Sequence, residues 1–314
     1  MIYIGIDVGA TTIKAGAVDE KGAILYKEAV PTGIERGYGP MIRDMAELAI
    51  QVTEKSGHTM ADVKSIGIGI PGIMNQATGR VPFCTNLKWH DVPMIEEMHR
   101  YVDVPVYVDN DATVAGLAES VAGVSAGAKN SVFITLGTGI GGGIILDGKV
   151  FTGSHGVASE IGHSITVDGG EPCNCGKRGC WERYASATAL IREGRRLCER
   201  DPECALMRAV DGALDAITAK HIFDLAKEGD PGCTELFNWY VHHLCLGIRN
   251  LINTYDPEMF VLGGGVSHAG DFLLNAVRRE LPNWVFFKSM PFARVELAKL
   301  TNDAGIIGAA MLGR

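Results

Sequence analysis

The chain opens with the stretch IYIGIDVGATTIKAGAV, residues 2–18, in which a short polar turn separates two apolar runs. The first run, 2–7, and the second, 12–18, are rich in β-branched and small apolar residues, which favour strands. A short turn between two such strands is typical of a β-hairpin. A second turn at 19–22 leads into a third apolar run, so we expect a further strand at 23–29.

The same layout returns in the middle of the chain, at residues 131–146. An apolar run at 131–136 is followed by the glycine-rich turn 137–139 and by a second apolar run at 142–146. We interpret the two stretches as copies of one hairpin, each at the core of its own lobe. Single hydrophobic cores stop growing at about 250–300 residues, so a chain of 314 residues is consistent with two lobes.

Apolar spacing predicts the other helices and strands. The expected elements are a helix that carries Met41, Met45, Leu48, Ala49 and Val52, strands at 65–70 and 104–108, a helix at 112–122, a helix with an apolar face from Leu236 to Ile252, a strand at 259–262 and a terminal helix at 303–312. Strands mixed with helices in two similar halves predict an α/β protein with a cleft between its lobes.

Composition limits the partners of the protein. The formal net charge is −8, with 37 acidic and 29 basic residues, and no stretch is rich in Lys or Arg, so we expect no nucleic-acid partner. No apolar run approaches the roughly 20 residues of a membrane span, and the first strand begins without a secretory signal. We therefore expect no membrane partner and a cytoplasmic, reducing location, in which the eight cysteines are thiols or metal ligands.

The turn of the first hairpin has the features of a phosphate-binding loop. Gly9 lets the backbone approach an anion closely, and backbone amides together with the hydroxyls of Thr11 and Thr12 are donors for phosphate oxygens. Asp7, at the end of the strand, offers a carboxylate to hydrated Mg²⁺. An ordinary Asp–Gly turn is the alternative interpretation.

Two glycine-rich turns later in the chain support this interpretation. Five of the seven residues at 137–143 are glycine, which is costly in a plain strand and is explained by the close approach of a ligand. Residues 263–267, Gly-Gly-Gly-Val-Ser, follow another predicted strand, where a nucleotide base and ribose would fit. The chain has no G-x-x-x-x-G-K-[ST] loop. Together these features favour the fold of the actin-like sugar kinases over that of the P-loop enzymes.

Three polar residues end the strand that precedes the predicted helix at 112–122. Asp109, Asn110 and Asp111 lie at the carboxyl end of this strand, where α/β proteins bind their ligands. We predict that Asp111 is the general base that takes the proton from a sugar hydroxyl, and that Asn110 orients the sugar ring. A helix N-cap is the alternative, and it accounts for one of the three residues.

The most specific pattern in the chain consists of His163, Cys173, Cys175 and Cys180. One histidine and three cysteines around a glycine-rich loop are typical of a closed, structural zinc site. Unpaired cysteines and a disulfide are the alternatives. The remaining cysteines have no such spacing and are interpreted as core or surface thiols: Cys84, Cys198, Cys204, Cys233 and Cys245.

The predicted zinc site would also organise a wall for a ligand. A metal bound to one ring nitrogen of His163 leaves the other nitrogen available to a ligand hydroxyl. Glu160 lies three residues before this histidine, and Glu182 follows the last cysteine of the loop. We expect the three side chains to form one wall of a sugar site.

Together these motifs resemble the ROK family of bacterial repressors, open reading frames and sugar kinases. The resemblance covers essentially the whole chain and rests on residues 7–11, 71–72, 110–112, 136–143, 160–163, 173–182 and 262–266. The cysteine loop with its Glu-x-Gly-His is the most specific part. The first loop of the family commonly reads Asp-x-Gly-Gly-Thr, and Ala10 replaces the second glycine here.

The resemblance implies a two-lobed actin/hexokinase-like (ribonuclease H-like) ATPase fold, with a small lobe of residues 1–115 plus 301–314 and a large lobe of 116–300 that carries the zinc loop 172–181. It implies an enzyme that uses ATP and Mg²⁺, with structural Zn²⁺, to phosphorylate a hexose at its 6-hydroxyl, and that forms a homodimer or homotetramer. The sugar contacts that it implies are Gly72, Asn110, Asp111, Glu160, His163 and Glu182, and the zinc ligands are His163, Cys173, Cys175 and Cys180. The nucleotide-binding residues expected from the motifs and the resemblance are Asp7, Gly9, Thr11, Thr12, Gly137, Thr138, Gly139, Gly264 and Gly265.

Several alternatives remain for the function. A ROK repressor carries an N-terminal helix-turn-helix, for which a strand that begins at residue 2 leaves no room. A non-catalytic sugar-sensing protein would not need Asp111 and both phosphate loops. A kinase for fructose, allose, mannose, N-acetylmannosamine or N-acetylglucosamine would use the same Glu/His wall. Residues 158–159, Ala-Ser, differ from the proline often seen in the fructokinases of the family, which favours glucose. The phosphate donor is open among ATP, ADP and polyphosphate.

Overall fold

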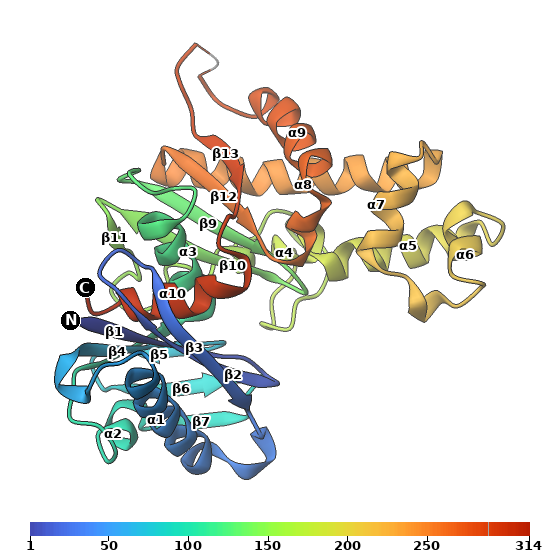
Figure 1. The fold of residues 1–314 in the computed structure, drawn as a ribbon. Coiled ribbons are helices and arrows are strands. Elements are labelled where there is room, and N and C mark those ends of the chain that lie inside the picture. The colour runs from blue at the N-terminus through green and yellow to red at the C-terminus, as the bar shows by residue number, and fades with distance from the viewer. Residues whose placement is uncertain (288) are drawn as a thin grey trace. The chain divides into compact units, whose positions relative to one another are not determined.

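The computed structural model describes residues 1–287 and 289–314 (Figure 1). The chain forms two compact units. The first unit comprises Met1–Phe133, Gly143–Ser159 and Ala298–Arg314, and the second comprises Ile134–Gly142 and Glu160–Leu297. The lobe boundaries expected from the sequence, 1–115 with 301–314 and 116–300, stay a prediction.

The first sheet has the strand order β3-β2-β1-β4-β8. Its strands are β1 (Ile2–Val8), β2 (Thr12–Val18), β3 (Ile24–Pro31), β4 (Val63–Ile70) and β8 (Val106–Asn110). Strand β1 pairs antiparallel with β2 and parallel with β4, and β4 pairs parallel with β8. The five strands predicted in this part of the chain are confirmed, with ends that differ by one or two residues.

Helix α1 (Tyr38–Lys55) covers one face of the first sheet (Figure 1). Ile4 and Ile6 of β1 are buried in one cluster with Met41 and Met45 of the helix. Met41 and Met45 are among the positions that the helical spacing predicted, and the burial of these apolar side chains stabilises this face.

Helix α10 (Ala304–Met311) lies on the opposite face of the first sheet (Figure 1). A Cβ atom on Gly5 would lie 1.8 Å from the carbonyl oxygen of Ile306, and one on Gly67 would lie 1.7 Å from that of Ala309. These two glycines therefore allow the helix backbone to contact the sheet directly. The carboxyl-terminal helix thus completes the unit that the amino terminus begins.

A small antiparallel sheet, in the order β5-β6-β7, was not expected from the sequence. Its strands are β5 (Ile73–Asn75), β6 (Arg80–Cys84) and β7 (Trp89–Val92), and helix α2 (Met94–Met98) follows. The strands are short, and Phe83 in β6 is half-exposed, so their apolar pattern is weak. Val81, Trp89 and Val92 nevertheless join the core of the first unit.

The second five-stranded sheet has the order β11-β10-β9-β12-β13. Its strands are β9 (Ser131–Leu136), β10 (Ile140–Leu146), β11 (Lys149–Val150), β12 (Met259–Gly263) and β13 (Arg294–Leu297). This order corresponds, strand for strand, to that of the first sheet. In both sheets the last two strands pair in parallel. The predicted duplication therefore appears in the strand order of the two sheets. The second hairpin is divided between the units, with 134–142 in the second and its outer ends in the first, so it is not the core of a separate lobe as expected.

The remaining helices are α3 (Asp111–Ala122), α4 (Glu182–Ala185), α5 (Ala187–Arg200), α6 (Ala205–Ala209), α7 (Ala219–Lys227), α8 (Pro231–Tyr255) and α9 (Asp271–Glu280). Helix α8 buries the predicted apolar face. A Cβ on Gly247 of this helix would lie 1.9 Å from Cε2 of Trp181, so the indole ring packs directly on the helix backbone. In the part of the chain that the structure describes, no helix combines the length and the apolar character that a membrane span requires.

Candidate active site and metal centre

The predicted general base lies where β8 passes into α3. Asn110 is the N-cap of the helix, and its Oδ1 accepts a hydrogen bond from the N–H of Ala112 at 2.9 Å. Its Nδ2 donates to the carbonyl oxygen of Gly72 at 3.2 Å. Asp111 is the first helical residue, it is exposed, and its Oδ1 also accepts from Ala112 at 2.8 Å. The cap is therefore Asn110, and the Asp111 carboxylate lies at the positive end of the helix dipole.

Gly72 lies in the bend between β4 and β5. A Cβ at this position would lie 2.9 Å from the Cβ of Cys84 and 3.1 Å from the carbonyl oxygen of Phe83. The thiol of Cys84 donates to the carbonyl oxygen of Pro71 at 3.2 Å. The first unit thus brings together three of the predicted sugar contacts, Gly72, Asn110 and Asp111.

The first phosphate loop, so named for its predicted role, connects β1 and β2. The N–H of Gly9 donates to the carbonyl oxygen of Thr12 at 3.0 Å, and Thr11 is exposed. Asp7 lies at the end of β1, 3.6 Å from Nζ of Lys14. Burial raises the pKa of Asp7 in spite of this lysine. A divalent cation beside the carboxylate would favour its charged form, so the residue suits the predicted Mg²⁺ role.

The second phosphate loop, Gly137–Thr138–Gly139, is fixed by its own unit. The N–H of Gly137 donates to the carbonyl oxygen of Gly139 at 3.0 Å. The hydroxyl of Thr188, in α5, donates to the carbonyl oxygen of Thr138 at 2.7 Å. Oε2 of Glu182 accepts from the N–H of Ile140 at 3.4 Å, directly after the loop. Glu182 therefore belongs both to this loop and to the predicted sugar wall.

The third glycine turn packs against the second. Gly264 has φ = 81°, which favours glycine, and a Cβ there would lie 2.6 Å from the carbonyl oxygen of Leu136. Helix η5 (Gly265–Ala269) follows, and the hydroxyl of Ser267 donates back to the carbonyl oxygen of Gly264 at 2.7 Å. The second unit therefore places the predicted nucleoside residues beside the second phosphate loop.

The four predicted zinc ligands lie close together. The ligand atoms of His163, Cys173, Cys175 and Cys180 all lie within 4.8 Å of one another. Cys173 Sγ lies 3.6 Å from His163 Nδ1, and Cys175 Sγ lies 3.5 Å from Cys180 Sγ. Tetrahedral zinc with bonds of about 2.0–2.3 Å separates its ligands by roughly 3.5–3.8 Å. These two separations match those of a zinc site, so the cluster is compatible with the predicted ion.

Burial disfavours a charged thiolate at Cys180. Without metal, burial raises the pKa of Cys180 to about 12, and the neighbouring Cys175 and Cys173 add to the effect. A thiolate in this position therefore needs a nearby positive charge. Zinc would supply it, hold the loop together, and release protons as it binds.

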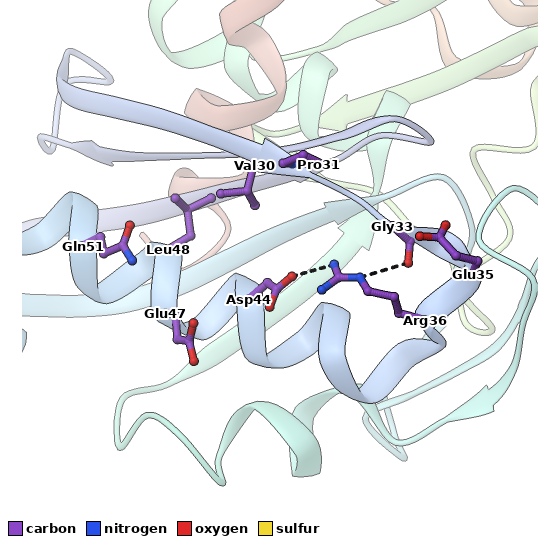
Figure 2. A pocket seen from close by; sticks show the side chains of 9 residues that line it. All are labelled: Val30, Pro31, Gly33, Glu35, Arg36, Asp44, Glu47, Leu48 and Gln51. Carbon is purple, nitrogen blue, oxygen red and sulfur yellow. Dashed lines mark hydrogen bonds and ion pairs between the residues drawn. The ribbon is translucent and has the colours of Figure 1, made fainter.

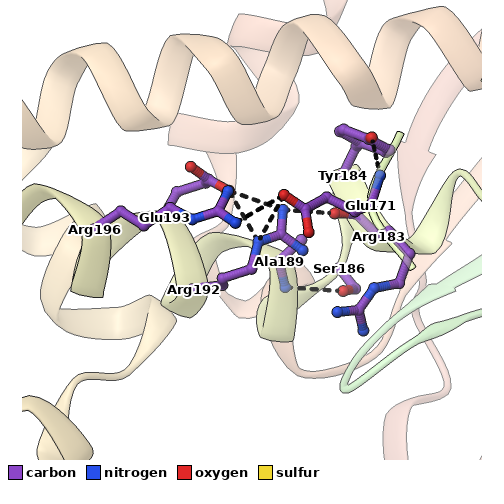
Figure 3. Close-up of polar contacts among 8 residues, drawn as sticks. All are labelled: Glu171, Arg183, Tyr184, Ser186, Ala189, Arg192, Glu193 and Arg196. Carbon is purple, nitrogen blue, oxygen red and sulfur yellow. Dashed lines mark hydrogen bonds and ion pairs between the residues drawn. The ribbon is translucent and has the colours of Figure 1, made fainter. Parts of the chain in front are cut away.

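The zinc loop is tied to helices α4 and α5 through Glu171 (Figure 3). Arg196 Nη2 lies 2.8 Å from the Glu171 carboxylate, and this contact lowers the pKa of the acid. The backbone N–H of Glu171 donates to the hydroxyl of Tyr184 at 2.7 Å, and its carbonyl oxygen accepts from Gly179 at 2.8 Å. Glu171 is therefore anchored to both helices, and Gly179 is bonded back to it.

His163 joins the metal centre to the predicted sugar wall. Its Nδ1 faces the cysteines, whereas its Nε2 lies 3.9 Å from Oε2 of Glu160. Nδ1 also lies 3.9 Å from Oε1 of Glu182. Nδ1 thus faces Cys173, whereas Nε2 faces Glu160, and the role of this histidine in a sugar site stays a prediction. The second unit brings together Glu160, His163 and Glu182.

Sequence reasoning missed two hydroxyl contacts at these loops, those of Thr188 and Ser267. Each donates to a carbonyl oxygen of a glycine-rich turn. Their only signal in the sequence is a hydroxyl side chain near the start of a helix, which is common in proteins.

The duplicated sheets, each with a hairpin turn that carries glycine and threonine, define an actin/hexokinase-like protein of the ribonuclease H-like class. Residues 3–314 match the ROK family, and the chain belongs to it. It is 38% identical over 316 residues to a glucokinase of Streptomyces coelicolor, with 100% of this chain and 98% of that protein covered. It is 37% identical to a ROK family glucokinase from Streptomyces griseus, solved in complex with glucose and AMPPNP, with a TM-score of 0.80 and 99% of both chains covered. A ROK hexokinase from Thermus thermophilus is 31% identical, with a TM-score of 0.82 and 99% of this chain and 97% of that chain covered.

Proposed function

We propose that the chain is a glucokinase, an enzyme that transfers the terminal phosphoryl group of Mg-ATP to the 6-hydroxyl of glucose. The observation that carries the proposal is the exposed Asp111 carboxylate at the start of α3, in a chain similar to glucokinases over its full length. Relatives of the same family with other activities share the fold, so the function rests on this site.

In this reaction Asp111 acts as the general base. Its carboxylate accepts the proton of the 6-hydroxyl as that oxygen attacks phosphorus, a contribution of about 10²–10⁴-fold for a positioned base. Asn110 holds the start of α3 to Gly72 and so fixes the position of the carboxylate. ATP with Mg²⁺ supplies the phosphoryl group and neutralises its charge.

The other predicted residues have binding roles. Gly9, Thr11 and Thr12 of the first loop, with Asp7 for Mg²⁺, and Gly137, Thr138 and Gly139 of the second loop hold the phosphates, and Gly264 and Gly265 hold the nucleoside. Gly72, Asn110, Glu160, His163 and Glu182 hold the sugar hydroxyls. The geometry of His163 supports this assignment because Nε2 is directed away from the cysteines and toward Glu160.

The test is the release of ADP from Mg-ATP with glucose, mannose, fructose, allose, N-acetylglucosamine and N-acetylmannosamine as acceptors. We expect the highest kcat/KM with glucose. Asp111→Asn, which keeps the size of the side chain, should lower kcat by about 10²–10⁴-fold. Asp103→Asn removes another exposed carboxylate of the same unit and should leave kcat and the KM values unchanged. Near-normal turnover in Asp111→Asn would refute the catalytic role.

Other outcomes of the same assay reassign the function. A preference for another hexose retains the mechanism and changes the substrate. Turnover with ADP or polyphosphate in place of ATP changes the donor. Sugar binding without turnover on any donor identifies a sugar-sensing protein.

The location and assembly are also part of the proposal. Mg-ATP and a reduced cysteine site are both expected in the cytoplasm, where thiols stay reduced. A homodimer or homotetramer, as the family resemblance implies, is tested by light scattering of the purified protein.

A further inference from the structure

Thr32 lies directly after β3 and is fully buried, with 0% of its surface exposed. Its hydroxyl donates to the carbonyl oxygen of Gly9 at 2.7 Å, and its backbone N–H donates to the carbonyl oxygen of Thr11 at 3.0 Å. One residue therefore binds two carbonyl groups of the first phosphate loop, about twenty residues earlier in the chain.

These two bonds determine which way the loop amides point. In a trans peptide the carbonyl oxygen of one residue and the N–H of the next lie in one plane and point in opposite directions. With the Gly9 carbonyl directed at Thr32, the N–H of Ala10 is directed away from it. The same holds for the Thr11 carbonyl and the N–H of Thr12. Both amides are thus oriented on the side of the loop opposite Thr32.

Arg36 fixes Thr32 in turn, and Figure 2 shows the contacts of Arg36 with Asp44 and Gly33. Its Nη2 donates to the carbonyl oxygen of Thr32 at 3.0 Å and to Oδ2 of Asp44 in α1 at 2.6 Å. Gly33, between them, has φ = 60°, and a Cβ there would lie 2.3 Å from Nε of Arg36. The glycine thus leaves space for the guanidinium group.

A pocket borders this support. Arg36 and Asp44 line a cavity of about 420 Å³ together with Val30, Leu48 and Gln51. The arginine side chain is 36% exposed, so Arg36 tolerates substitution better than the buried threonine.

We propose that Thr32 is a positioning residue for the phosphate donor, and that Arg36 acts through it. Together they orient the N–H groups of Ala10 and Thr12 toward the phosphate chain of the nucleotide. The inference rests on the proposed kinase function, and it assigns no chemical step to either side chain.

The experiment compares Thr32→Val, which lacks the hydroxyl but keeps the shape, with Thr32→Ser, which restores it. The KM for Mg-ATP should rise about tenfold in Thr32→Val and less than threefold in Thr32→Ser, the scale of one lost hydrogen bond to a loop. The KM for the sugar and sugar binding should stay at the wild-type level. Binding of AMPPNP, measured by calorimetry with saturating sugar, should weaken by the same factor.

Thr53→Val is the matched control. Thr53 is also fully buried in the first unit, and its hydroxyl donates to the carbonyl oxygen of Ala49 within α1. This variant should leave both KM values unchanged. Arg36→Met should raise the KM for Mg-ATP, and the double variant with Thr32→Val should be no worse than Thr32→Val alone, because both act on one loop.

Each outcome decides the inference. An unchanged KM for Mg-ATP in Thr32→Val, or an equal rise in the two KM values, would overturn it while leaving the kinase function intact. If Thr32→Val does not fold, Arg36→Met carries the test, and an unchanged KM for Mg-ATP in that variant overturns the inference. A wild-type protein without turnover on any donor would overturn the proposed function itself, and the inference with it.

Discussion

The Asn110 side chain connects two segments of the first unit, because its Nδ2 donates to the carbonyl oxygen of Gly72 at 3.2 Å while its Oδ1 caps α3. The amide therefore combines a capping role with a tie to the bend after β4. An acid of the same size would retain the first role and lose the second, because a carboxylate cannot donate.

Asn110→Asp should accordingly leave stability near that of the wild type. It should raise the KM for the sugar by about tenfold or more, because the hydrogen bond to the carbonyl oxygen of Gly72, a predicted sugar contact, is lost. Asn110→Ala should in addition lose the cap, at a cost of about 1 kcal/mol. Thermal unfolding and steady-state kinetics of the two variants separate the roles. Equal melting temperatures in Asp and Ala variants would contradict the capping assignment.

Asp109, the residue before this cap, should make stability depend on pH. Burial raises its pKa from 3.8 to about 6, although its carboxylate accepts from the N–H of Asn110 at 2.7 Å. The folded state therefore holds the proton more tightly than the unfolded state. The contribution of Asp109 to stability is greatest below pH 3.8, falls as the pH rises toward 6, and is constant above that.

Asp109→Asn retains the hydrogen bond and removes the charge. We expect the variant to be more stable than the wild type above pH 6, by at most about 3 kcal/mol, since each tenfold change in acidity corresponds to about 1.4 kcal/mol. The gain should vanish near pH 4. Denaturant titrations between pH 4 and 8 measure the free energy of unfolding of both proteins. A difference between them that does not change with pH would exclude the titration of Asp109 as its source.

Much of this fold follows from local sequence. Strand β1 and helix α1 are predictable because Ile4, Ile6, Met41 and Met45 have the spacing of a strand and of a helix. The small sheet β5-β6-β7 escaped prediction because its strands are short and Phe83 lies half-exposed on one of them. Its order depends on packing that no local pattern records.

The candidate site likewise has parts that local sequence predicts and parts that depend on the folded structure. The metal cluster was predictable because spacing and residue type alone identify it. The support of the first loop by Thr32 was not, because a single threonine after a strand carries no signal, and its role depends on pairing with Gly9 far away in the sequence. Glu182 was expected in the sugar wall, but its bond to Ile140 emerges only from the folded second unit.

Removal of the metal should loosen the sugar wall. We expect about one zinc per chain, and Cys180→Ser should lose it, lower the melting temperature and raise the KM for the sugar, because His163 and Glu182 lose their support. Cys204→Ser, outside the cluster, should retain the zinc and the kinetics. Elemental analysis and kinetics of both variants check this. A zinc-free Cys180→Ser protein with a normal KM for the sugar would show that zinc does not support the sugar wall.

The two glycines of the second phosphate loop should respond differently to a methyl group. A Cβ on Gly139 would lie 2.5 Å from Oε2 of Glu182, whereas one on Gly137 meets no atom within 4 Å. Gly139→Ala must therefore displace the Glu182 carboxylate from its bond to Ile140. Since Glu182 also faces His163, we expect Gly139→Ala to raise the KM for the sugar as well as that for Mg-ATP. Gly137→Ala should affect the nucleotide alone. Steady-state kinetics with each substrate varied in turn distinguishes the two, and matching sugar KM values in both variants would show that Glu182 does not couple this loop to the sugar wall.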